Sequence, residues 1–187
     1  EISFALALLL AATMSSTDSA SVFSILRSKK QGLKQHLRPL LELESGSNDP
    51  MAYMLTILLI GVVTNSQGGG GLGMSALYFV VQLVVGTLSG YLIGRLAVWT
   101  INKITLANPS LYSVLLLAFI FFAFAFTDLV KGNGYLAVYL AGLVVGNHKL
   151  AQKRSLTVFF DGFTWLMQIV MFLTLGLFVN SDELLRP

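Results

Sequence analysis

Residues 41–64 read LELESGSNDPMAYMLTILLIGVVT, an apolar run whose first part is interrupted by acidic and small polar residues. The apolar stretch from 39 to 64 is longer than the about 20 residues that a helix needs to cross a bilayer. Glu44 and Asp49 therefore fall inside a predicted membrane helix. A carboxylate near the bilayer centre costs about 2.5–3.5 kcal/mol on insertion scales, and membrane proteins that keep one commonly use it. The interruption Glu44–Pro50 is accordingly the first candidate for a functional site.

The composition of the whole chain agrees with a membrane protein. Of its 187 residues, 55% are hydrophobic and 11% are charged, whereas soluble domains have about 25% charged residues. We expect an all-α membrane protein with about six helices, the first of them interrupted. The expected segments are 2–25, 39–64, 75–100, 111–128, 134–147 and 157–179. The chain begins at Glu1 directly in an apolar run, so we interpret residues 1–187 as one partial transmembrane domain, an internal fragment of a longer protein.

The distribution of positive charge predicts the orientation. If the first segment ends on the inner side, the loops 27–38, 101–109 and 148–155 lie on that side and are cytoplasmic. Ten of the twelve Lys and Arg residues lie in or close to these loops, and only Lys131 and Arg186 lie outside. Such an asymmetry is the usual signature of cytoplasmic loops. We interpret the basic loop 27–38 as a topological signal and expect no nucleic-acid partner.

A second polar interruption, Ser15–Ser19, brings Asp18 into the first apolar segment. Asp18 lies nine residues before Arg27, which is about 14 Å along a helix. Asp49 lies eleven residues beyond Arg38, which is about 16 Å by the same helical rise. Both distances are close to half of the about 30 Å core of a bilayer. We therefore expect the two interruptions to meet at one depth and to form one site.

The local sequence around Asp49 adds detail to this site. Glu44 and Asn48 are four residues apart, as are Ser45 and Asp49, so that each pair shares a helix face. Pro50 removes a backbone donor, and with Gly46 we expect it to loosen the helix. The hydroxyl groups in the first segment can bond to the backbone and favour unwinding. Irregular backbone at membrane depth is tolerated where it lines a cavity or lies inside the protein.

Together, Thr17-Asp18 and Glu44-Ser45-Gly46-Ser47-Asn48-Asp49-Pro50 resemble the monovalent cation/proton antiporter family, in the branch with an Asn-Asp pair. The stretches 134–147 and 159–177 are similar to the same family. The resemblance implies an inverted-repeat antiporter fold with about 12 to 14 helices, of which this chain would be the middle half. It also implies a bacterial inner-membrane protein that forms a homodimer at full length.

The resemblance further implies a role for each residue of the motif. Asp49 would bind the monovalent cation, K+ or Na+, and carry the proton, with Asn48 as its uncharged neighbour. Thr17 and Asp18 would form the partner on the unwound helix, and Ser45 could supply a hydroxyl ligand. Glu44 would have a supporting role, for which a structural salt bridge is the favoured interpretation.

The chemistry of a single buried carboxylate suits secondary antiport. Removal of a carboxylate from water favours the protonated form, so that one group can hold either a proton or a cation. The alternatives are a cation channel and a non-transporting membrane subunit with structural buried acids. The sequence has no catalytic triad, nucleotide motif or Cys, so we expect a transporter and not an enzyme, with no cofactor.

Two glycine ridges predict close helix packing. Gly86, Gly90 and Gly94 recur every four residues, as do Gly142 and Gly146. Small residues at this spacing allow neighbouring helices to approach closely. Contact within one protomer is the favoured interpretation, and a dimer face is the alternative.

Overall fold

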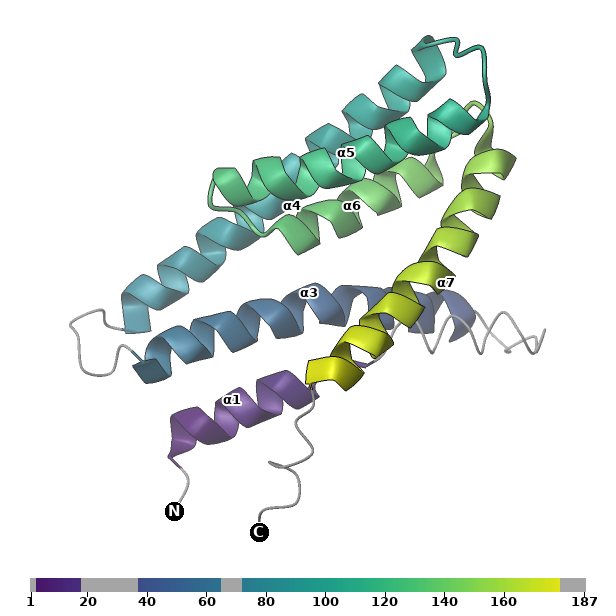
Figure 1. The fold of residues 1–187 in the computed structure, drawn as a ribbon. Coiled ribbons are helices and arrows are strands. Elements are labelled where there is room, and N and C mark those ends of the chain that lie inside the picture. The colour runs from purple at the N-terminus through teal and green to yellow at the C-terminus, as the bar shows by residue number, and fades with distance from the viewer. Residues whose placement is uncertain (1–2, 18–36, 65–71, 179–187) are drawn as a thin grey trace.

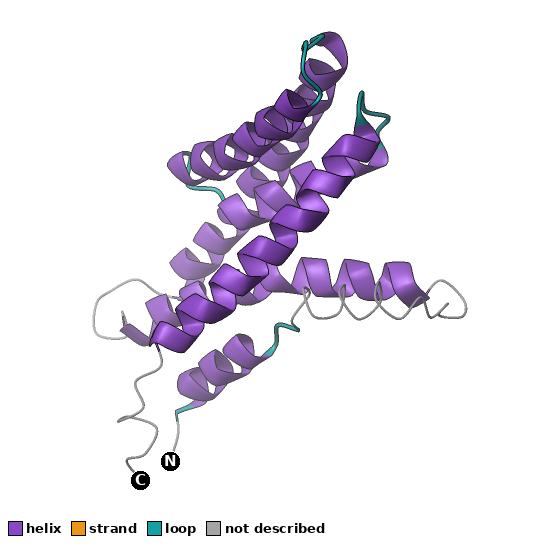
Figure 2. Cartoon of the chain, turned by 45° about the vertical axis from the view of Figure 1, so that its right-hand side comes forward, coloured by secondary structure: helices purple, strands orange, loops and turns teal. Residues whose placement is uncertain are grey.

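The computed structural model describes residues 3–17, 37–64 and 72–178, and within these ranges the chain forms helices and no strands. The helices are α1 (Phe4–Met14), α3 (Leu37–Thr64), α4 (Leu72–Lys103), α5 (Ser110–Leu129), α6 (Gly134–Asn147) and α7 (Lys153–Phe178). The prediction of an all-α fold is confirmed. Figure 2 shows the helices joined by short loops where the connections are described.

Helix length and hydropathy separate the six helices into two groups. Four are long and apolar enough to cross a membrane: Pro39–Thr64 of α3, Ala76–Lys103 of α4, α5 and α7. The helices α1 and α6 are apolar but shorter. The described end of the first segment is not helical beyond Met14, as expected for an interrupted helix.

The helices α4, α5 and α6 lie side by side and form the packed part of the molecule (Figure 1). The closest approach is between α4 and α6, at the ridge of Gly86, Gly90 and Gly94. A Cβ placed on Gly90 would lie 2.5 Å from the carbonyl oxygen and 2.8 Å from the Cα of Ala137. The ridge on α4 therefore packs within the protomer, as predicted. A Cβ at Gly142 or Gly146 would meet no described atom within 4 Å.

The ends of these helices are held by specific hydrogen bonds. Asn133 caps α6, because its side chain accepts from the N–H of Leu136 at 2.9 Å. The buried Tyr112 hydroxyl donates to the carbonyl of Ile104 at 2.8 Å and accepts from the N–H of Leu106 at 3.1 Å. It thus fixes the loop between α4 and α5 against the first turn of α5.

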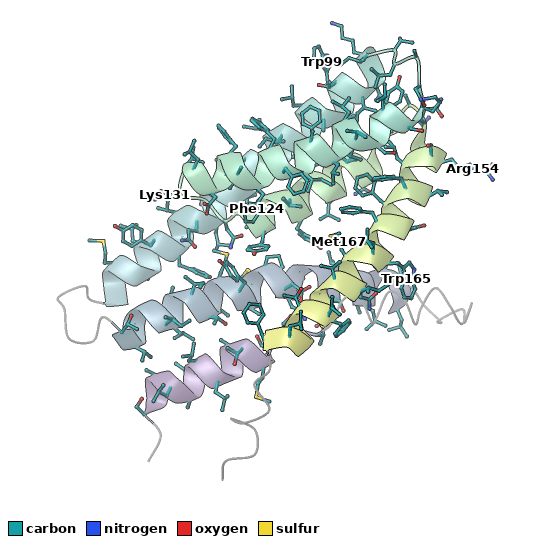
Figure 3. All side chains as sticks on the ribbon, in the orientation of Figure 1. Trp99, Phe124, Lys131, Arg154, Trp165 and Met167 are labelled. Carbon is teal, nitrogen blue, oxygen red and sulfur yellow. The ribbon has the colours of Figure 1, made fainter. Side chains whose placement is uncertain are left out.

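The labelled charged residues lie at opposite ends of this bundle. In Figure 3, Arg154 and Trp99 lie toward one end of the α4–α6 bundle, and Lys131 lies toward the other. At the first end the Asn102 side chain donates to the carbonyl of Lys149 and accepts from the N–H of Ala151, both at 2.9 Å. The described loops 104–109 and 148–152 therefore lie at the same end, as the alternation of segments predicts.

Helices α1 and α3 form a second pair beside this bundle, and α3 also contacts α4 and α6 (Figure 1). The expectation that Gly46 and Pro50 loosen α3 is wrong, because α3 continues as one helix from Leu37 to Thr64 with Pro50 inside it. Pro50 removes only the bond that the carbonyl of Gly46 would accept. The other bonds of the helix, and the burial of Pro50, are enough to keep it continuous.

Candidate functional site

The end of α1 is shaped by its hydroxyl side chains. The Thr13 hydroxyl donates to the carbonyl of Leu10 at 2.8 Å, and the Ser15 hydroxyl donates to the carbonyl of Ala12 at 2.7 Å. Hydroxyl groups that bond to backbone carbonyls in this way weaken the last turn of a helix, and the carbonyl of Ala12 also accepts from the N–H of Ser15 at 3.3 Å. The chain then leaves the helix, and Ser16 and Thr17 are not helical. This is the unwinding predicted for the first segment, within its described part.

The unwound end of α1 meets the acidic segment of α3 through three hydrogen bonds. The Ser16 hydroxyl donates to Oδ1 of Asp49 at 2.5 Å. The Thr17 hydroxyl lies 3.3 Å from the hydroxyl of Ser45. The Asn48 amide donates to the Thr17 hydroxyl at 2.8 Å. Of the residues predicted for the site, Thr17, Ser45, Asn48 and Asp49 are therefore brought together, while Asp18 lies outside the described residues.

Glu44 lies next to this cluster and holds two of its members. Its Oε1 accepts from the Asn48 amide at 3.0 Å, and its Oε2 accepts from the Ser45 hydroxyl at 3.3 Å. A carboxylate that accepts two bonds from neighbouring side chains fixes their orientation. Glu44 thus orients Asn48 and Ser45, which lie on the same helix as Glu44. The supporting role of Glu44 at the site stays a prediction.

The orientation of the Asn48 amide leaves an oxygen with no donor. Its Nδ2 faces the carboxylate of Glu44 and the hydroxyl of Thr17, both of which can accept a hydrogen bond. The opposite orientation would place Oδ1 against the Glu44 carboxylate, which has no proton to give when ionised. In the observed orientation Oδ1 is buried and has no hydrogen-bond partner among the described residues. A buried acceptor of this kind costs free energy unless something else satisfies it.

The cluster is buried on the side of α3 and exposed at Ser16, Thr17 and Glu44. The Ser45 side chain is 1% exposed, and Asn48 and Asp49 are partly buried. Carboxylate, amide carbonyl and hydroxyl oxygens are ligands that suit hard cations. Among the described residues no three His, Cys, Asp or Glu side chains lie close enough to hold a metal ion. The arrangement is therefore one carboxylate, Asp49, beside neutral hydroxyl and amide groups, with a second carboxylate, Glu44, behind Asn48 and Ser45.

Sequence reasoning missed two residues at this site. Ser16 belongs to the predicted polar interruption, but only its hydrogen bond shows that it is the partner of Asp49. Tyr139 of α6 reaches the adjacent face of α3, where a Cβ on Gly46 would lie 2.8 Å from its ring. The position of Ser16 in a hydroxyl run was a usable signal. An aromatic residue in an apolar helix gives no such signal.

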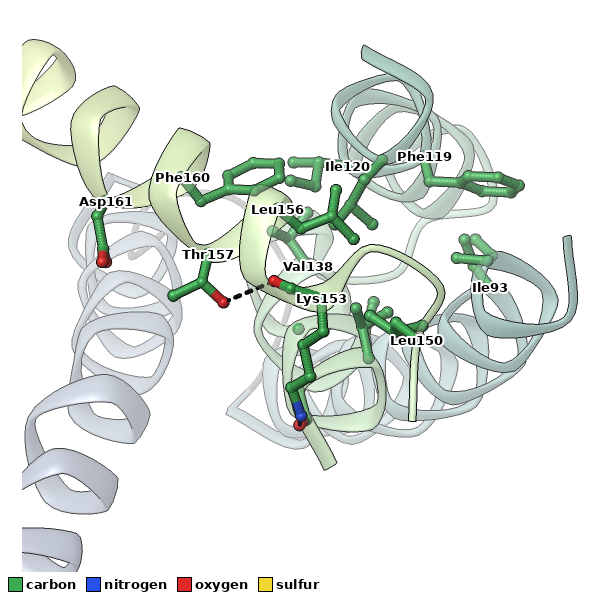
Figure 4. Close-up of a pocket in the computed structure, with 16 residues that line it drawn as sticks. Ile93, Phe119, Ile120, Val138, Leu150, Lys153, Leu156, Thr157, Phe160 and Asp161 are labelled. Atoms are coloured by element: carbon green, nitrogen blue, oxygen red, sulfur yellow. Dashed lines mark hydrogen bonds between the residues drawn. The ribbon is translucent and has the colours of Figure 1, made fainter. Parts of the chain in front are cut away.

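A separate cavity of about 470 Å³ lies between α4, α5, α6 and α7, and Figure 4 shows its lining. The lining is mostly apolar, with Lys153, Thr157 and Asp161 contributed by α7. The Thr157 hydroxyl bonds to the carbonyl of Lys153 at 2.9 Å. Thr17, Ser45, Asn48 and Asp49 are not among the residues that line this cavity. The polar cluster between α1 and α3 is therefore distinct from it.

Comparison with known proteins places the chain in a family. The K(+)/H(+) antiporter NhaP of Alkalimonas amylolytica is 44% identical over 179 residues, and the K(+)/H(+) antiporter NhaP2 of Shewanella sp. strain ANA-3 is 37% identical over 178 residues. Both alignments cover 95% of this chain, and the chain spans 30% of the length of each relative. The family model for the transmembrane part of sodium/hydrogen exchangers matches residues 1–185. The chain is thus an integral membrane protein that belongs to the sodium/hydrogen exchanger family.

Proposed function

We propose that the protein exchanges a monovalent cation for protons across a membrane, with Asp49 binding either ion. The observation that carries this proposal is the junction of α1 and α3. There the end of a short helix brings the Ser16 and Thr17 hydroxyls to the segment that bears Asp49. Unwound helix ends beside a carboxylate are a common design for ion sites in secondary transporters.

The ligand set would be centred on Asp49. Ser16 and Thr17 bring hydroxyl oxygens, and Asn48 offers a buried oxygen that no described group satisfies. A cation bound to the Asp49 carboxylate would also satisfy this amide oxygen of Asn48. Asp18 completes the set in the proposal, since it follows Thr17 directly in the chain.

Exchange follows from competition for one carboxylate. When Asp49 is ionised it binds the cation, and when it is protonated the charge that holds the cation is gone. A carrier that exposes this group to one side and then to the other moves one ion inward for one outward. A channel would need no such competition, and therefore a saturable, proton-coupled flux separates the two mechanisms.

Potassium is the first candidate for the cation, and sodium is the second. The two relatives reported above are both named K(+)/H(+) antiporters, whereas the family as a whole is described as sodium/hydrogen exchangers. The proposal also includes a bacterial inner membrane, the cytoplasmic loops 27–38, 101–109 and 148–155, and a homodimer of the complete protein.

The test is an exchange assay with the complete protein in vesicles. A pH gradient is established, and K+, Na+ or Li+ is added at a series of pH values. The proposal predicts that one or more of these ions dissipates the gradient with saturable kinetics. A protein that is inserted correctly and yet dissipates no gradient with any of the three ions would overturn it.

A further inference from the structure

Helix α3 contacts two different neighbours with two adjacent faces. Ser45 and Asn48 contact the unwound end of α1 through Thr17. Gly46 and Tyr53 contact α6 instead. Successive residues of an α-helix are about 100° apart around its axis. The face toward α6 is therefore turned by about a quarter of a circle from Ser45.

Asp49 lies on the border between these two faces. It follows Ser45 by four residues, which is about 40° around the helix, and it follows Gly46 by three residues, which is about 60° in the other direction. Its rise above Gly46 is about 4.5 Å, less than one helical turn. Ser16 covers the carboxylate from the side of α1. The side toward α6 is the side that Tyr139 approaches.

The ring of Tyr139 lies against α3 at Gly46. A Cβ on Gly46 would lie 2.8 Å from Cε2 of Tyr139 and 3.5 Å from its hydroxyl oxygen. The absence of a side chain at Gly46 is thus what lets the ring reach the backbone of α3. No hydrogen bond of the Tyr139 hydroxyl is found among the described residues, so the contact depends on the ring.

We propose that Tyr139 is a positioning residue that forms the wall of the Asp49 site on the side of α6. The inference rests on the proposed exchange at Asp49. The ring keeps water from the flank of α3 beside the carboxylate and fixes the distance between α3 and α6 at that level. Removal of the ring lets water hydrate the carboxylate, and bound water competes with the cation.

The interface offers a matched control in Tyr135. Tyr135 lies four residues before Tyr139, one turn away on the same helix. Its ring packs against Tyr53 with centroids 4.6 Å apart and against Phe124 with centroids 5.1 Å apart. Tyr135→Ala removes an equal aromatic volume from the same interface, but at a level about 6 Å beyond Asp49 along α3.

The experiment measures cation-dependent exchange by the complete protein in vesicles for the wild type, Tyr139→Ala, Tyr139→Phe and Tyr135→Ala. We expect Tyr139→Ala to raise the KM for the cation about tenfold, as for the loss of a group that supports an ion ligand. Its maximal rate should fall by much less. Tyr139→Phe keeps the ring and should restore a KM within about twofold of the wild type, and Tyr135→Ala should leave the KM unchanged.

Two results overturn the inference: a wild-type KM in Tyr139→Ala, or an equal rise in KM in Tyr135→Ala. If Tyr139→Ala does not fold, Tyr139→Leu fills part of the space and is judged by the same criteria. If the wild type itself exchanges no cation for protons, the proposed function fails and the inference falls with it. If the wild type exchanges and Tyr139→Ala matches it, only the inference fails.

Discussion

The packing of α4 against α6 makes a quantitative prediction at Gly90. In the Gly90→Ala variant, the new Cβ would lie 2.5 Å from the carbonyl oxygen, 2.8 Å from the Cα and 3.0 Å from the carbonyl carbon of Ala137. All three are backbone atoms of α6, so that no side-chain rotation relieves the overlap. Ordinary contacts between carbon atoms are about 3.5–4.0 Å. The two helices must therefore separate by about 1 Å.

The free-energy cost of overpacking at Gly90 can be isolated by comparing Gly90→Ala with Gly142→Ala. Overpacking of a filled contact costs typically about 1–3 kcal/mol. Alanine also favours a helix over glycine by about 1 kcal/mol, and this gain applies to both variants. At Gly142 a Cβ would meet no described atom within 4 Å. The difference in free energy of unfolding between the two variants should therefore equal the overpacking cost alone, about 1–3 kcal/mol.

The assay is the apparent Tm of the complete protein in detergent, followed by loss of the monodisperse species on heating. A loss of stability of about 1 kcal/mol lowers the Tm by at most about 2–4 °C in a protein at least as long as this chain. Gly90→Ala should thus unfold at a lower temperature than Gly142→Ala, with a difference of at most about 12 °C. Equal Tm values for the two variants would refute the close approach of α4 and α6 at Gly90.

Two further predictions concern individual hydroxyl groups. Ser16→Ala removes the donor to Asp49 and one oxygen from the proposed ligand set, so the KM for the cation should rise about tenfold in the vesicle assay; an unchanged KM would show that Ser16 does not support the site. Tyr112→Phe removes the bonds to Ile104 and Leu106 and should lower the free energy of unfolding by about 1 kcal/mol. The exposed Tyr78 serves as its control, because Tyr78→Phe should leave the Tm unchanged, and equal Tm values for the two variants would show that the Tyr112 bonds contribute nothing.

Hydropathy was enough to predict most of the helices, because a long continuous apolar run can satisfy its backbone in lipid by itself only as an α-helix. The segment expected at 134–147 has the same bounds as α6. The segment expected at 157–179 starts four residues after the first residue of α7, which is Lys153. The predicted start at 157 is too late for a simple reason. The first turn of α7 carries Lys153 and Arg154, which a hydropathy pattern assigns to a loop.

The meeting of the two polar interruptions could also be predicted, from depth alone. Equal distances from one basic loop placed Asp18 and Asp49 at one level. Asp18 lies outside the described residues, and the hydrogen bonds of its neighbours Ser16 and Thr17 to residues 45–49 agree with the meeting of the two interruptions. The continuity of α3 through Pro50 could not be predicted, since it depends on tertiary burial that outweighs one lost backbone bond. The contact of Tyr139 with Gly46 depends on the angle between two helices, which no single segment encodes.

Exchange as proposed above requires that Asp49 bind the cation and the proton in turn. The most direct measurement is cation-induced dissipation of a pH gradient by vesicles that contain the complete protein with Asp49→Asn, beside the wild type at equal protein content. Asparagine keeps the shape of the side chain and can neither be ionised nor take up the transported proton. We expect the wild type to dissipate the gradient and Asp49→Asn to dissipate none, at any cation concentration. Full exchange by Asp49→Asn would contradict it.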